Sequence, residues 1–210
     1  MDDLRPELNS YGATHIYSPN IDKLSKVGVQ FNEAYANVAV CGASRASMLT
    51  GIYPSRNYFI DYKTRADVEK KEIVSLAKHL KNNGYTTISN GKIYHFLDDK
   101  WEDWDEVWRP YAFEGPKEIK PIDWWESLWK DYQTKENKDL ENLTGKGPAF
   151  EEAFVEDSIL IDGLLTNKVI SDIKRLKKES SPFFLTAGFI SNHLPFIAPK
   201  RFWDMYDYES

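Results

Sequence analysis

The apolar residues of this chain follow two different periods, and segments with the two periods alternate. Residues 73–83 carry apolar side chains at helical spacing, and Asn83-Gly84 follow as a stop signal. The apolar positions are Ile73, Leu76, Ala77 and Leu80. Residues 85–89 are rich in β-branched side chains and predict a strand. A helix that leads directly into a strand is typical of an α/β sheet.

The same order of helix and strand recurs near the end of the chain. Asp162 or Thr166 can cap a helix that runs to about Lys178. Its apolar stripe consists of Leu165, Val169, Ile173 and Leu176. Residues 182–189 form a continuous apolar run, as a strand covered on both faces does. We therefore expect an α/β fold with a mostly parallel sheet flanked by helices.

Residues 97–150 lack a clean period. They mix carboxylates with tryptophans and are interrupted by prolines and glycines. The tryptophans are Trp101, Trp104, Trp108, Trp124, Trp125 and Trp129. Exposed indole rings could stack on sugars, but tryptophans more often anchor an irregular loop to the core. We predict a long, irregular, acidic insertion in this range.

Charge and composition argue against some classes of partner. The 210 residues hold 27 Lys and Arg against 33 Asp and Glu, and no basic run, which argues against a nucleic-acid partner. No apolar run approaches a membrane span, and the acidic start Met1-Asp2-Asp3 is unlike a signal peptide. We expect a soluble chain, with its compartment unknown.

The candidate chemistry lies in residues 40–51, which contain the only cysteine, Cys41. Ser44 can cap the turn that follows, and amides at a helix start favour an anion. Arg45 adds a bidentate donor for sulfate or phosphate oxygens. These residues indicate a cysteine at an anion-binding site. The alternative is a buried structural cysteine beside a capped helix.

The same segment resembles the signature of the sulfatase family, Cys-x-Pro-Ser-Arg-x-x-x-Leu-Thr-Gly, with Ala43 in place of the proline. The resemblance implies an alkaline-phosphatase-like α/β fold. It also implies that a formylglycine-generating or other maturation enzyme oxidises Cys41 to formylglycine, whose hydrate attacks the sulfate ester. Arg45 would then stabilise the charge of the sulfate group.

The start of the chain resembles the iduronate-2-sulfatase-like branch of that family, through Asp2-Asp3-Leu4-Arg5-Pro6 and residues 18–24. There, paired aspartates end the first strand and bind a divalent cation. The resemblance makes Asp2, Asp3 and Cys41 ligands of Ca²⁺ or, as a second choice, Mg²⁺, and oxygen ligands suit such hard cations. No apolar strand precedes Asp2 in these residues, so we expect the sheet to lack its first strand.

Three more residues match the family. Lys92 and His95 follow the strand at residues 85–89, and the ends of strands are where α/β folds place active sites. Gly-Lys-x-x-His resembles the sulfatase pattern in which both side chains contact formylglycine or sulfate. His193 matches a substrate-contacting histidine, but residues 190–192, Ile-Ser-Asn, replace the usual His-Lys-Pro. The usual substrate is therefore in doubt.

Together these features predict that residues 1–210 are the N-terminal portion of a sulfatase catalytic domain, without the family's C-terminal part. The implied reaction is hydrolysis of a sulfate ester on a sulfated sugar or polysaccharide, with Cys41, Arg45, Lys92, His95 and His193 as catalytic residues. Full-length relatives are mostly exported. One alternative is a truncated, inactive remnant or carbohydrate-binding relic. Another is phosphate transfer on the same fold, which the cysteine motif disfavours.

Overall fold

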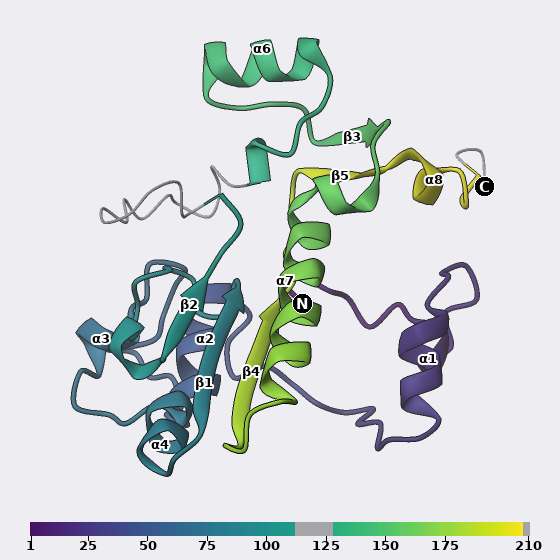
Figure 1. Ribbon diagram of the computed structural model, residues 1–210. Helices are drawn as coiled ribbons and strands as arrows, with labels where there is room; N and C mark the ends of the chain where they lie inside the picture. Colours follow the sequence, from purple (N-terminus) through teal and green to yellow (C-terminus); the bar gives the residue numbers. More distant parts are fainter. Residues whose placement is uncertain (112–127, 208–210) are drawn as a thin grey trace.

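Figure 1 shows a computed structural model of the protein, which describes residues 1–111 and 128–207. Three parallel strands form the central sheet in the order β2-β1-β4. The strands are β1 (Thr86–Gly91), β2 (Glu106–Trp108) and β4 (Phe183–Gly188). Ile88 at the centre of β1 lies opposite Glu106 on one side and Leu185 on the other. The predicted α/β fold with a parallel sheet is confirmed.

Helices pack on this sheet. They are α2 (Cys41–Thr50), α4 (Leu76–Asn82) and α7 (Ile161–Leu176). In Figure 1, α7 runs alongside β4 and α2 lies behind the sheet, while α4 packs on β1. The main core joins Ala43, Ala46 and Leu49 of α2 to Ala77, Trp104 and Phe184. Burial of these apolar surfaces holds α2 and α4 against the sheet.

A smaller parallel sheet of β3 (Phe150–Ala153) and β5 (Phe196–Pro199) lies near the first turn of α7. Its core contains Tyr132, Ala153, Leu160 and Ile197. The other elements are η1 (Asn9–Tyr11), α1 (Pro19–Ser25), α3 (Ala66–Glu69), η2 (Trp101–Asp103), α6 (Lys135–Thr144), η3 (Asp157–Ile159) and α8 (Lys200–Trp203). No helix among the described residues is long and apolar enough to cross a membrane.

The range 97–150 is more regular than its sequence suggests. It contributes β2 to the main sheet, and it also contains η2, α6 and the first residue of β3. A three-residue strand is too short to show a period, which is why the pattern concealed β2. Trp104 is buried and stacks on Phe184 with ring centroids 5.8 Å apart, so this indole anchors the segment to the core. Trp124 and Trp125 lie outside the described residues.

Helix boundaries and faces differ from the sequence pattern at several positions. Helix α4 begins at Leu76 because the Ser75 hydroxyl accepts a hydrogen bond from Lys78 N, and Leu76 itself is exposed. Ile173 of α7 is exposed, although the stripe predicted its burial. Asp172 takes the buried position beside it because the Asn90 amide donates to its carboxylate at 2.8 Å.

Three further apolar side chains in or near helices are exposed. Met48 of α2 is 65% exposed, whereas its neighbour Leu49 is buried. Leu24 of α1 and Val27, which follows that helix, are also exposed. Helical spacing alone cannot say which side of a helix meets the sheet.

The end of β4 approaches Lys92 so closely that only glycine fits at position 188. A Cβ there would lie 2.1 Å from Lys92 O and 2.7 Å from Lys92 N. We predict that Gly188→Ala lowers the free energy of unfolding by about 3 kcal/mol, because backbone on both sides must shift. Urea titration measures this change.

Gly28→Ala is the matched control, because its Cβ would meet only Leu24 O at 3.2 Å. We expect this control to change the free energy of unfolding by about 0.5 kcal/mol or less. Equal effects of the two substitutions would contradict the close approach of β4 to Lys92.

Candidate active site

The carboxyl ends of the three parallel strands meet at one edge of the sheet. A charged residue, or a segment that contains a histidine, follows each strand. Lys92 comes directly after β1, Arg109 directly after β2, and residues 189–193 directly after β4. Helix α2 presents its first residue, Cys41, to the same edge, where Cys41 Sγ lies 3.3 Å from His95 Nδ1. Such an edge is the usual place of an active site in α/β folds.

The start of α2 differs from the sequence prediction in one respect. The helix begins at Cys41 rather than after Ser44, and its N-cap residue is Val40, which has no capping side chain. Ser44 N donates to Val40 O at 2.8 Å, so Ser44 already lies inside the helix. Cys41 therefore occupies the first turn, where backbone amides favour negative charge.

Asp2 is the centre of the site. Its Oδ2 lies 2.5 Å from Lys92 Nζ and its Oδ1 lies 2.8 Å from an Arg45 guanidinium nitrogen. Asp2 and Lys92 are almost completely buried. Arg45 also donates to the carbonyl oxygens of Lys92 and Ile93. One guanidinium thus ties α2 to the segment after β1 and to the start of the chain.

Burial and pairing act in opposite directions on these groups. Although burial disfavours the Asp2 charge, Lys92 and Arg45 together hold the pKa of Asp2 below its usual value. For Lys92 burial dominates, and it lowers the pKa of the ammonium despite the attraction of Asp2. The result is a buried ion pair whose members depend on each other for charge compensation.

His95 and Cys41 are both uncharged at neutral pH. Burial and the nearby Lys92 charge lower the pKa of His95 to about 4, so its imidazole is neutral at pH 7. Burial raises the pKa of the Cys41 thiol, and nearby Lys92 only partly opposes this. A thiol with a raised pKa is a weak nucleophile, since the thiolate is the reactive form.

Asp3 and His193 form the outer part of the site. The Asp3 side chain is 58% exposed, and its Oδ2 lies 3.6 Å from His193 Nε2. Asp2 N donates to Phe189 O at 2.9 Å, which holds the start of the chain against the segment after β4. All seven residues singled out by the sequence therefore lie in one connected neighbourhood.

The fit to a divalent cation is partial. Asp2 and Asp3 supply oxygen ligands of the kind that calcium prefers, yet calcium takes six to eight such ligands. Both oxygens of Asp2 already contact cationic side chains. Within residues 1–111 and 128–207, no cluster of three or more His, Cys, Asp or Glu side chains is arranged to hold a metal ion. Asp2 and Asp3 therefore do not by themselves complete a site for such a cation.

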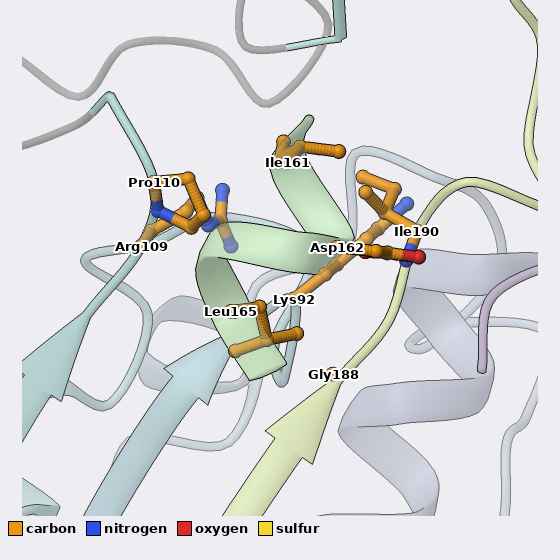
Figure 2. A pocket seen from close by; sticks show the side chains of 9 residues that line it. Lys92, Arg109, Pro110, Ile161, Asp162, Leu165, Gly188 and Ile190 are labelled. Atoms are coloured by element: carbon orange, nitrogen blue, oxygen red, sulfur yellow. The ribbon is translucent and has the colours of Figure 1, made fainter. Parts of the chain in front are cut away.

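Sequence reasoning missed Arg109. This guanidinium is buried, donates to Tyr94 O at 3.3 Å, and contributes to the low pKa of His95. Figure 2 shows Arg109 and Lys92 beside a cavity of about 10 Å³ near the first turns of α7, room for about one water. The rule that active-site groups follow strands would have found Arg109 if β2 had been recognised.

The low pKa of His95 predicts how stability depends on pH. The folded protein binds this proton less readily than the unfolded chain does, so the free energy of unfolding falls as the pH drops from about 6.5 to about 4. In His95→Asn this fall becomes shallower, which urea titrations at a series of pH values measure. His79→Asn, which removes an exposed histidine of α4, is the matched control and keeps the wild-type slope. An unchanged slope in His95→Asn would contradict the assignment.

The chain is similar in sequence and in fold to several known proteins. Iduronate 2-sulfatase of Mus musculus is 32% identical over 212 residues, which cover all of this chain and 37% of that protein. Iduronate 2-sulfatase of Homo sapiens is 30% identical over 220 residues, again 37% of its length. The crystal structure of the phosphonate monoester hydrolase of Agrobacterium radiobacter shares the fold, with a TM-score of 0.64 and 17% identity over 97% of this chain and 42% of that one.

The chain thus spans well under half the length of these relatives. A family model for sulfatases matches residues 1–209, nearly the whole chain. Because this match extends from Asp2 through His193, it includes every residue of the candidate site. The chain belongs to the sulfatase family.

Proposed function

We propose that the protein hydrolyses sulfate esters of a sulfated sugar or polysaccharide, with Cys41 converted to formylglycine by a maturation enzyme. The observation that carries the proposal is the position of Cys41. It lies in the first turn of α2, 3.3 Å from a neutral His95, beside the cationic pair Lys92 and Arg45. The negative charge on the oxygens of a transferring sulfate group is stabilised by fixed cations and helix amides of this kind.

The raised pKa of Cys41 supports conversion over direct use of the thiol. A protonated thiol attacks poorly, and its attack on sulfur would leave a stable ester with no second internal nucleophile to release it. When present, formylglycine would supply a hydroxyl nucleophile, and a divalent cation held partly by Asp2 and Asp3 would neutralise sulfate oxygens.

The remaining residues have separate roles in this proposal. Lys92 and Arg45 hold charge at the sulfate position, and their low exposure strengthens the interaction. His95, uncharged at neutral pH, accepts a proton from the group at position 41. His193, which lies near Asp3, gives a proton to the departing alcohol oxygen.

A second candidate is an inactive portion of a sulfatase or a carbohydrate-binding relic. One observation favours it: both Asp2 oxygens are engaged by Lys92 and Arg45 rather than left open to a cation. Calcium titration of residues 1–210 separates the candidates, because an incomplete site binds weakly or not at all.

Paired aryl sulfate and aryl phosphate esters test the reaction class. We expect the native protein to hydrolyse the sulfate ester faster, and chelation of divalent cations to reduce the rate. Arg45→Ala should lower kcat/KM for the sulfate ester by about 100-fold, since it removes one fixed charge from the sulfate position. Arg56→Ala, which removes an exposed arginine of a turn outside the candidate site, is the control and should retain the activity.

Faster turnover of the phosphate ester would contradict the proposed reaction. Absence of turnover in native protein that carries formylglycine would favour the inactive alternative.

A further inference from the structure

Asp162 is a carboxylate that the reaction scheme above does not use, although it lies at the edge of the site. It belongs to the first turn of α7, and Figure 2 shows it beside Ile190. Its Oδ1 accepts from Ile190 N at 3.0 Å, and its Oδ2 accepts from Ser191 N at 3.0 Å. Two successive backbone amides therefore converge on one carboxylate and favour its charged form, although burial raises the pKa of Asp162 overall.

The segment that Asp162 binds, residues 190 and 191, borders the site. Phe189 O, one residue before this segment, accepts from Asp2 N at 2.9 Å. His193, two residues after it, donates its amide to Ile190 O at 2.8 Å, and its ring lies near Asp3. Fixing residues 190 and 191 thus sets the position of both the Asp2 backbone and the His193 ring.

The helix end that carries Asp162 is itself held firmly. Asp131 accepts from Ile161 N at 2.9 Å, and the Tyr111 hydroxyl donates to Asp131 at 2.9 Å. Leu165, one turn further on, is almost completely buried. The carboxylate of Asp162 is consequently attached to a rigid base, and the helix start adds favourable electrostatics for its negative charge.

We propose that Asp162 is the positioning residue that holds His193 in place for protonation of the leaving alcohol. The inference rests on the proposed sulfate-ester hydrolysis. Because Asp162 binds backbone amides, it holds the segment whichever side chains stand at positions 190–192. In the step concerned, the bond between sulfur and the alcohol oxygen breaks, the oxygen keeps the electron pair, and His193 transfers its proton to that oxygen.

Asp162→Asn in the native protein tests the proposal, since the amide keeps the size of the side chain but turns an N–H toward one of the two backbone donors. Sugar and alkyl sulfates have poor leaving groups that need a proton, whereas a nitrophenyl sulfate does not. We expect kcat/KM to fall about tenfold or more for the sugar sulfate and to change little for the nitrophenyl sulfate.

Asp172→Asn is the matched control. It alters a buried carboxylate of the same helix that accepts from the Asn90 amide instead of the segment 189–193. A general loss of stability would lower both rates together in either variant. An equal loss on both esters in Asp162→Asn would therefore overturn the proposal.

A measurement without turnover keeps this test separate from that of the proposed function. In ¹⁵N-histidine spectra of the native protein, the His193 ring signal, assigned by its loss in His193→Gln, should shift in Asp162→Asn and stay in place in Asp172→Asn. An unmoved signal would overturn the positioning role. A shifted signal in a protein that hydrolyses no sulfate ester would leave the positioning role standing and contradict the proposed function.

Discussion

The buried carboxylate of Asp2 is the contact on which the rest of the site depends. It joins Lys92, which follows β1, to Arg45 of α2, and its own backbone is bonded to the segment after β4. Removal of either cation would leave charge buried without full compensation, which is far more costly than loss of a surface ion pair. Three separate parts of the chain are thereby held in one arrangement around Cys41.

This arrangement explains why a small parallel sheet suffices to build the site. The strands β1, β2 and β4 end at one edge, so Lys92, Arg109 and the segment carrying His193 meet there although they are far apart in sequence. Gly188 permits the backbone of β4 to approach Lys92. The cationic groups then surround the first turn of α2, which is suited to an anionic group on the residue at position 41.

Much of this could be predicted from the sequence, for identifiable reasons. The strands at residues 86–91 and 183–188 follow clear helical segments, and Lys92 and His95 were found because they follow a strand. The three residues of β2 carry no period, so Arg109 was missed. The role of Asp162 depends on amides of Ile190 and Ser191, 28 and 29 residues away, which no local pattern reveals. The exposure of Met48 likewise depends on how α2 meets the sheet.

The central claim is that Cys41 is the precursor of the nucleophile in a sulfatase. Mass spectrometry of the proteolytic peptide that contains Cys41, prepared from the native protein, tests it most directly. We predict the mass of the aldehyde at position 41, with a hydrazide reagent adding to that residue. A peptide that carries only the unmodified thiol, in protein made alongside a working maturation enzyme, would contradict the account.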